Sequence, residues 1–314
     1  MILFCLMIGS GLCLLTYGSD ALVRGAEALA LRMGLPPLVL GLTIVAWGTS
    51  SPELVVSIQS GLNGQPDIAL GNVVGSNIFN VCVILGITAL ICPIAVEKQI
   101  LKSDMPFMIA VSAMMVYFLN DGSLSSVESL AFIAVLFGYT TWLIVAGLKQ
   151  PVVEDEGLKE ALQPGTKQSV LMEIVQVVLG LVLLVAGSEL LLKGSLGIAR
   201  SAGLSEAIIG LTIVAAGTSM PELATSVTAA LKKSPGIAIG NVVGSNIFNI
   251  LGILGFTGCV LPLQAGNITV LDLGMALGSS LLLWPLLYSQ SKLSRSEGVL
   301  LIGLYLGYLS WIWP

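Results

Sequence analysis

Charged residues are scarce in this sequence, and histidine is absent. Only 10% of the 314 residues are charged and 55% are hydrophobic, whereas a soluble globular domain usually carries about 25% charged residues. This deficit excludes a water-soluble fold for most of the chain. The lack of histidine excludes His-ligated zinc or iron and any triad or proton shuttle that needs an imidazole. Because no other nucleophile with a base, aspartate pair or metal triad is visible, we expect neither an enzyme nor a resident cofactor.

Long apolar runs are present instead. Each has about 20 residues, which is enough for a helix to cross a ~30 Å hydrocarbon core. The five cysteines lie in or at the ends of these runs without a CxxC pair, and we interpret them as small core residues. The sequence therefore predicts an all-α polytopic membrane protein with ten transmembrane helices. The ten segments cover residues 1–19, 38–61, 69–91, 104–120, 126–148, 170–192, 206–231, 237–261, 270–289 and 297–313.

Lysine and arginine are distributed unevenly between the two sides that ten spans define. Eleven lie in loops on one side and two on the other, and cytoplasmic loops carry the excess of these residues in membrane proteins. We therefore expect both termini outside the cytoplasm and the loop near 149–169 inside it. The eleven are Arg24, Arg32, Lys98, Lys102, Lys149, Lys159, Lys167, Lys232, Lys233, Lys292 and Arg295, and the two are Lys193 and Arg200.

The chain contains an internal repeat with an offset of 169 residues. GLTIVAWGTSSPEL (41–54) aligns with GLTIVAAGTSMPEL (210–223), and GNVVGSNIFN occurs identically at 71–80 and 240–249; 27 of the 40 positions from 41 to 80 are identical in the second copy. Five predicted spans separate the copies, and an odd number reverses the orientation of the second copy in the membrane. We therefore predict two inverted five-helix repeats, 1–148 and 170–314, joined by a cytoplasmic linker at 149–169.

One glutamate lies in the middle of a predicted span in each repeat, within the motif GTSxPE. A carboxylate at this depth costs several kcal/mol and indicates a functional site. Thr49 and Glu53 are four residues apart, as are Thr218 and Glu222, so each pair projects from one helix face. Inverted repeats bring matched motifs together near the membrane midplane, and we expect these four side chains to meet there.

Backbone and amide oxygens extend this set. Proline lacks an N–H and kinks a helix, so the proline of GTSxPE deprives the carbonyls of Gly48 and Gly217 of their helical partners. The carbonyls of Ala46 and Ala215, one turn before the threonines, are further candidates. In the next span of each repeat, side chains with oxygen recur every four residues: Asn72, Ser76, Asn80, Asn241, Ser245 and Asn249.

The resulting set offers carboxylate, hydroxyl, amide and carbonyl oxygens but no nitrogen or sulfur ligand, so it favours hard cations. Ca²⁺ accepts about six to eight oxygens in a tolerant geometry, whereas Mg²⁺ demands a tight octahedron. Two carboxylates balance one Ca²⁺ or about two Na⁺, so these ions should compete for one site. Competition at a site that is reached from each side in turn is what exchange requires.

Packing is the alternative interpretation of other polar residues in these spans. We expect Asn77 and Asn246 to serve in packing or in bonds between helices. Acid and base pairs with i,i+4 spacing are predicted to form ion pairs at helix ends. Two such pairs are Asp20–Arg24 and Glu189–Lys193.

GTSxPE followed by GNxxGSN, present twice, resembles the sodium/calcium exchanger superfamily, and nearly the whole chain is similar to the compact prokaryotic calcium/sodium antiporters. The resemblance implies ten spans in inverted halves and exchange of several Na⁺ for one Ca²⁺ across a prokaryotic plasma membrane. It also implies that the first and sixth helices slide to open the site to each side. Some relatives have an aspartate at the position of Asn249. The residues that would line the ion sites are Ala46, Thr49, Ser50, Glu53, Ser76, Asn80, Ala215, Thr218, Ser219, Glu222, Ser245 and Asn249.

Other transport functions stay open at this point. Ca²⁺/H⁺ antiporters of the same superfamily resemble GNxxE in the third and eighth spans, where this chain has Gly75 and Gly244, and the missing acids favour coupling to Na⁺. Dependence on K⁺ is also open. A cation channel would usually place its filter on the axis of an oligomer, whereas this chain carries both motif copies. We expect Ca²⁺, Na⁺ and the lipid bilayer as partners and no nucleic acid, and a monomer is compatible with this arrangement.

Overall fold

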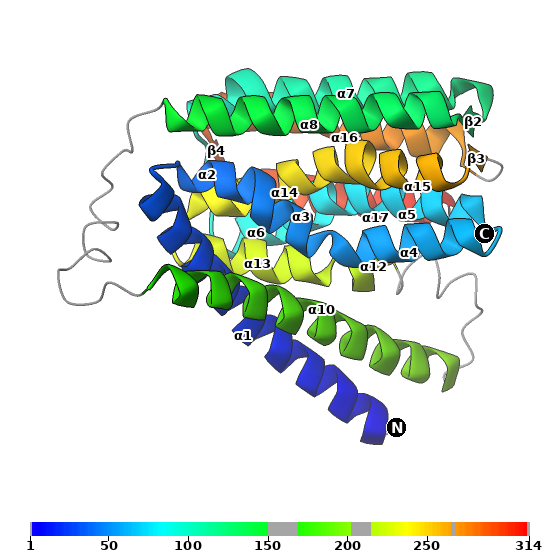
Figure 1. The fold of residues 1–314 in the computed structure, drawn as a ribbon. Helices are drawn as coiled ribbons and strands as arrows, with labels where there is room; N and C mark the ends of the chain where they lie inside the picture. Colours follow the sequence, from blue (N-terminus) through cyan, green and yellow to red (C-terminus); the bar gives the residue numbers. More distant parts are fainter. Residues whose placement is uncertain (1, 150–168, 202–214, 265–267, 313–314) are drawn as a thin grey trace.

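The protein is helical almost throughout, and most of its helices run along one common direction (Figure 1). This computed structural model describes residues 2–149, 169–201, 215–264 and 268–312. Nearly all of the predicted linker at 149–169 lies outside the described residues, as does the beginning of the predicted span 206–231.

The two halves contain corresponding elements. The helices of the first half are α1 (Ile2–Met33), α2 (Pro37–Leu40), η1 (Gly41–Val45), α3 (Ala46–Thr49), α4 (Ser51–Leu62), α5 (Pro66–Phe79), η2 (Asn80–Ile84), α6 (Leu85–Ile91), η3 (Ile100–Asp104), α7 (Met105–Phe118), η4 (Leu119–Asp121) and α8 (Ser126–Leu148). The helices described in the second half are α10 (Val170–Ser201), α12 (Ala215–Thr218), α13 (Met220–Leu231), α14 (Pro235–Phe248), η6 (Asn249–Leu254), α15 (Gly255–Val260), α16 (Val270–Gln290) and α17 (Arg295–Ile312).

Each of the ten predicted spans contains described helix. Within the described residues, seven helices are long and apolar enough to cross a membrane, and a bent pair, Pro37–Thr49 with Ser51–Leu62, makes an eighth. The other two predicted spans correspond to α17 and to α12 with α13, whose preceding residues are not described. The prediction of a polytopic, all-helical fold is confirmed, with the addition of two very short sheets.

These sheets join the two halves. Strand β1 (Ile94–Ala95) pairs antiparallel with β4 (Lys292–Leu293), and β2 (Ser123–Leu124) pairs antiparallel with β3 (Leu263–Gln264). An offset of 169 residues converts β1 into β3 and β2 into β4, so a pseudo-two-fold operation exchanges the sheets. In Figure 1, β4 lies at one end of the bundle, and β2 and β3 lie at the other. The repeats are therefore inverted with respect to each other.

Helices α1 and α10 extend well beyond the apolar segments predicted at 1–19 and 170–192. Each has 32 residues. The predicted segments ended where charged residues begin, but α1 continues because Leu22, Val23 and Ala26 are buried against the protein. A helix can leave the apolar zone and still be stabilised by packing on one face.

Glycines let α1 and α10 pack together closely at the outside of the bundle (Figure 1). A Cβ added to Gly11 would lie 2.7 Å from the carbonyl oxygen of Gly187, and one added to Gly18 would lie 2.9 Å from that of Gly180. Small residues permit such an approach of helix backbones. The contacts occur in opposite order along the two helices, so α1 and α10 are antiparallel.

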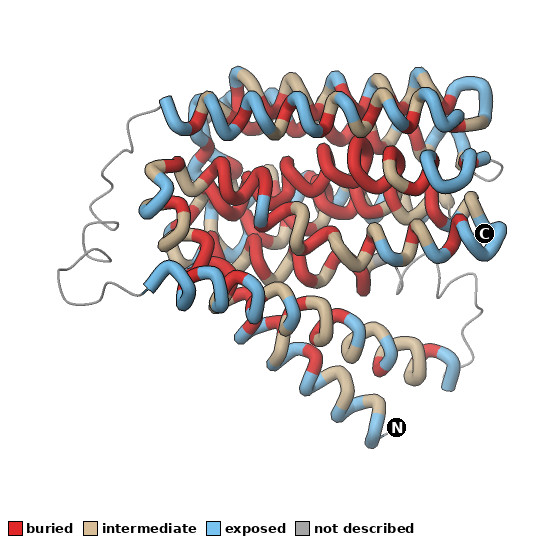
Figure 2. The backbone as a smooth tube through the Cα atoms, viewed as in Figure 1, coloured by how far each residue is buried: buried red, intermediate tan, exposed pale blue. Residues whose placement is uncertain are grey.

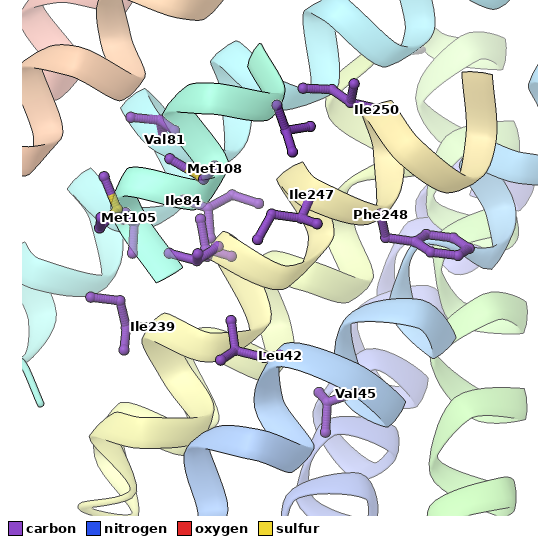
Figure 3. Close-up of a cluster of buried hydrophobic side chains, with 14 of the residues drawn as sticks. Leu42, Val45, Val81, Ile84, Met105, Met108, Ile239, Ile247, Phe248 and Ile250 are labelled. Carbon is purple, nitrogen blue, oxygen red and sulfur yellow. The ribbon is translucent and has the colours of Figure 1, made fainter. Parts of the chain in front are cut away.

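The core of the bundle is centred on α14, in which every residue from 236 to 248 is buried (Figure 2). Side chains of η1, α7 and α14 meet in one apolar cluster, with Leu42, Met105 and Ile239 among those that Figure 3 labels. Because α14 and the segment of the first half that carries the GTSxPE motif (41–54) share this core, the polar residues of both are held in a fixed register.

The cysteines do not all lie in this core. Cys82 is buried, but Cys5, Cys13 and Cys259 are exposed on the protein surface. The interpretation as core residues is therefore wrong for these three. A small apolar side chain is equally acceptable on a surface that faces lipid, so burial cannot be inferred from an apolar context in a membrane protein.

Candidate cation-binding site

Two kinked helices place the glutamates at the site. Glu53 lies in the first turn of α4 and Glu222 in the first turn of α13, each directly after the motif proline. The preceding serines have matching non-helical backbone angles, φ −83° and ψ 9° at Ser50 and φ −87° and ψ 10° at Ser219. In the first half, this break bends the span by 43°. A helix N-terminus stabilises a nearby negative charge, so both carboxylates occupy electrostatically favourable positions.

The glutamate of each half binds a serine of the other half. Ser50 Oγ donates to Glu222 Oε1 at 2.8 Å, and Ser219 Oγ donates to Glu53 Oε1 at 3.1 Å. Both carboxyl groups are buried, with 1% exposure at Glu53 and 0% at Glu222. The two acids predicted from the repeat are therefore brought together where the halves meet, and each is oriented by the opposite motif.

Four oxygens at this interface are buried without a hydrogen-bond partner among the described residues. They are Glu53 Oε2, Glu222 Oε2, Asn80 Oδ1 and Asn249 Oδ1. Buried acceptors without a donor are costly and uncommon in folded proteins. A cation satisfies such acceptors at once, and the donor set consists of hard oxygens only.

The asparagines of this set begin π-helical turns. Asn80 is the first residue of η2, and Asn249 is the first residue of η6. Such turns interrupt an α-helix and frequently occur at functional sites. The symmetric position of the two turns shows that the distortion belongs to the repeated motif.

The hydroxyl residues predicted for the site also lie at this interface. Ser219 Oγ lies 3.4 Å from Ser76 Oγ, and Ser245 Oγ lies 3.5 Å from the carbonyl oxygen of Ala46. Thr49 interacts with the carboxyl group of Glu222, and Thr218 interacts in the same way with Glu53. Each threonine thus faces the glutamate of the opposite half. Ala215 begins α12, and its carbonyl as a ligand stays a prediction.

The carbonyls freed by the prolines have other partners. The carbonyl oxygen of Gly217 accepts a hydrogen bond from Ser188 Oγ of α10 at 2.6 Å, and that of Gly48 accepts a backbone N–H at the kink. Of the partners expected for carbonyls that lose their helical bonds, the structure supplies protein donors and not an ion. Protein donors satisfy them because unpaired carbonyls are unfavourable inside a membrane.

Asn72 and Asn241 anchor the two motif helices instead of facing an ion. Asn72 Nδ2 donates to the carbonyl oxygen of Glu53 at 3.1 Å. Asn241 Nδ2 donates to that of Glu222 at 3.2 Å, while its Oδ1 accepts from Thr49 Oγ1 at 3.0 Å. The polar stripe in the sequence indicated these residues, but their spacing did not distinguish an anchor from a ligand.

A buried pair of acids between two inverted helical repeats is typical of an ion transporter. No cluster of three or more acidic or cysteine residues suited to a metal occurs among the described residues, so the site depends on two carboxylates. The chain belongs to the sodium/calcium exchanger family, whose model matches residues 3–145 and again 172–313. This is a family of transporters and not of enzymes.

The chain is similar over nearly its whole length to proteins from several organisms. The putative antiporter CaxA of Alkalimonas amylolytica is 39% identical over 308 residues, which cover 95% of each chain. The inner membrane protein YrbG of Escherichia coli (strain K12) is 34% identical, with 97% of this chain and 96% of YrbG covered. The structure of the sodium–calcium exchanger NCX_Mj soaked with 2.5 mM Na⁺ and 0.1 mM Ca²⁺ superimposes with a TM-score of 0.84 at 32% identity and covers 99% of both chains.

Proposed function

We propose that this protein is a secondary antiporter that exchanges Ca²⁺ for Na⁺ at one site, which opens alternately to each side of the membrane. The observation that carries the proposal is the group of four buried oxygens that have no hydrogen-bond partner in the described part of the chain, two of which belong to the carboxyl groups of Glu53 and Glu222. Two negative charges balance one Ca²⁺ or about two Na⁺, so binding of one ion species displaces the other. The Na⁺ and Ca²⁺ used with the similar NCX_Mj structure support the same pair of ions.

The proposed ligands are the twelve residues that the family resemblance implies. The carboxylates and the amide oxygens of Asn80 and Asn249 form the centre, because these oxygens lack other partners among the described residues. The motif threonines and serines, with the carbonyl of Ala46, complete a shell of neutral oxygens around them. Such a shell matches the coordination number and the hard-oxygen preference of Ca²⁺.

We place the protein in a prokaryotic plasma membrane with both termini outside the cytoplasm. Eleven of the thirteen Lys and Arg residues lie on the opposite side in this arrangement, as the preference for positive charge in cytoplasmic loops requires. The description of the similar YrbG as an inner membrane protein supports this location. Reporter fusions at the two termini and within 150–168 test the orientation.

Flux measurements in liposomes test the function directly. Purified protein with Na⁺ inside the vesicles should take up ⁴⁵Ca²⁺ when Na⁺ is absent outside, at a fixed and clamped pH. Glu53→Gln and Glu222→Gln should each abolish uptake, because one remaining carboxylate cannot balance a divalent ion. The matched control is Glu189→Gln, the same change at a side chain that is 61% exposed, which should transport normally. Full exchange in either site variant would contradict the proposal.

Two other outcomes would assign a different function. Uptake that follows a pH gradient and ignores Na⁺ would indicate a Ca²⁺/H⁺ antiporter. A Cβ at Gly244, one of the two positions where such relatives carry an acid, would lie 2.7 Å from the backbone of Leu42, whereas one at Gly75 would meet nothing within 4 Å. Unitary currents in planar bilayers would indicate a channel.

A further inference from the structure

Four asparagines form a closed set of hydrogen bonds across the interface of the halves. We call Asn77, Asn80, Asn246 and Asn249 the asparagine ring. Asn77 Nδ2 donates to the backbone carbonyl of Asn246 at 3.2 Å, and Asn246 Nδ2 donates to that of Asn77 at 3.3 Å. Asn80 Nδ2 donates to Asn246 Oδ1 at 3.0 Å, and Asn249 Nδ2 donates to Asn77 Oδ1 at 3.0 Å. All four residues are buried.

The chemistry of these bonds determines the orientation of every amide in the ring. A backbone carbonyl can only accept, so the amide of Asn246 must direct its NH₂ group to Asn77. Its Oδ1 is then available to Asn80, whose NH₂ group must face it. The remaining polar atom of Asn80 is its Oδ1, which is buried without a partner among the described residues. The same argument, starting from Asn77, leaves Oδ1 of Asn249 in the equivalent position.

We propose that Asn77 and Asn246 are positioning residues that make the amides of Asn80 and Asn249 present oxygen, and not NH₂, to the transported cation. This inference rests on the proposed function, in which the two amide oxygens are ligands. A primary amide has similar shapes in its two orientations, but its NH₂ group repels a cation. Each positioning residue acts on the opposite half, a pattern that we call the crossed arrangement. Asn77 orients Asn249, and Asn246 orients Asn80.

The crossed arrangement gives a specific test with double variants. Asn77→Ala removes the acceptor that orients Asn249, and we expect the KM for Ca²⁺ to rise about tenfold, the upper end of what the loss of one hydrogen bond between neutral groups implies. In an Asn249→Asp background, the same change should raise the KM less than about twofold, because a carboxylate has no NH₂ group to misorient. In an Asn80→Asp background, the roughly tenfold effect should persist.

The symmetry-related variants of Asn246 provide the internal control. The effect of Asn246→Ala should vanish in the Asn80→Asp background and persist in the Asn249→Asp background. All variants are compared as purified, monodisperse protein in the Na⁺-driven ⁴⁵Ca²⁺ assay, with each aspartate single variant as the reference for its doubles. Should an alanine variant fail to fold, Asn77→Ser and Asn246→Ser replace it, since serine is too short to reach the same partner.

Equal effects of Asn77→Ala in all three backgrounds would overturn the inference, because a residue that only packs is indifferent to the partner's chemistry. Absence of Na⁺-dependent flux in the unaltered protein would instead overturn the proposed function. The two failures are therefore distinguishable.

Discussion

At the residue scale, the negative charge of each glutamate is stabilised by a hydroxyl from the opposite half. Ser50 donates to Glu222, and Ser219 donates to Glu53. A hydrogen bond to a charged group is about twice as strong as one between neutral groups. These serines therefore hold one oxygen of each carboxyl group in place, while the other oxygen has no hydrogen-bond partner among the described residues and is available to the proposed ion.

Substitution of these serines should weaken ion binding without unfolding the protein. Ser50→Ala removes one charge-assisted bond, and we expect the KM for Ca²⁺ to rise about tenfold, as a loss of roughly 1.5 kcal/mol implies. Ser219→Ala should have a similar effect because the two bonds are symmetric.

The neighbouring Ser51 supplies the control for this measurement. Its Oγ donates to the carbonyl oxygen of Trp47 and not to a carboxylate, so Ser51→Ala should stay within about twofold of the unaltered protein. A KM for Ser50→Ala that equals that of Ser51→Ala would contradict a role of the cross-half bond.

The sequence predicted which residues the fold brings together better than it predicted their hydrogen-bond partners. GTSxPE identified both acids because a repeated intramembrane carboxylate is rarely structural. Which serine binds which glutamate depends on the register between the halves, and spacing within one helix carries no information about it. Asn77 and Asn246 were interpreted as packing or bonding residues, since an asparagine that orients a ligand has the same sequence pattern as one that links two helices.

At the element scale, α1 and α10 are joined by a bidentate ion pair as well as by glycine contacts. Arg32 Nε and Nη2 donate to the two carboxyl oxygens of Glu173 at 2.8 and 2.7 Å. The Glu173 side chain is 6% exposed, whereas that of Arg32 is 40% exposed. The pseudo-two-fold counterparts of Arg32 and Glu173 are Ser201 and Phe4, so this ion pair has no equivalent in the other half.

Removal of either partner should lower the melting temperature, but to different extents. Arg32→Gln leaves a buried carboxylate without its bidentate partner, whereas Glu173→Gln leaves a half-exposed guanidinium that water can solvate. We expect a loss of several degrees for Arg32→Gln and a smaller one for Glu173→Gln. The double variant should recover part of the loss. Thermal unfolding, monitored by fluorescence, checks this order, with Glu189→Gln as the exposed control. A larger loss for Glu173→Gln than for Arg32→Gln would contradict the burial of the Glu173 carboxylate.

Element boundaries were predicted less well than element identity. The ion pairs Asp20–Arg24 and Glu189–Lys193 form as their spacing predicted, but they lie in the middle of α1 and α10 and not at helix ends. Asp20 and Lys193 nevertheless ended the apolar windows that defined the predicted spans, although the helices continue past them. The two-residue strands were not predicted, because two residues are too few for an alternating pattern to be recognised.

At the scale of the whole molecule, the contacts that α1 makes with α13 differ from those at the symmetry-related positions of the other half. Ser19 Oγ lies 2.8 Å from Thr228 Oγ1 of α13, and Lys232 Nζ lies 2.5 Å from Asp20 Oδ1. The symmetry mate of Ser19 is Ser188, which donates to the carbonyl of Gly217 near the kink. The counterpart of Lys232 is Asn63. The contacts that hold α1 against α13 therefore differ from those at the symmetry-related positions.

Loss of the Asp20–Lys232 ion pair should loosen the packing of α1 against α13 and make buried residues of α13 more accessible. A cysteine in place of Thr225, which is buried one turn before Thr228, reports access in a cysteine-free background. We expect Lys232→Gln to accelerate modification of this cysteine by a water-soluble thiol reagent several-fold, because α1 is then less firmly attached to α13.

The control for this experiment is Lys193→Gln. Lys193 pairs with Glu189 of its own helix and not with α13, so its loss should leave the modification rate unchanged. Equal rates in the unaltered protein and in Lys232→Gln would show that the ion pair does not contribute to this packing.

The pairing of β1 with β4 and of β2 with β3 has a consequence for the origin of the chain. Neither half can form its strand contacts with itself, and each carboxylate is oriented by a serine from beyond its own half. A shorter ancestor with only one copy would have needed a second molecule inserted upside down in the same bilayer. When two copies that each contain an odd number of spans are joined in one polypeptide, they necessarily lie in opposite orientations in the membrane.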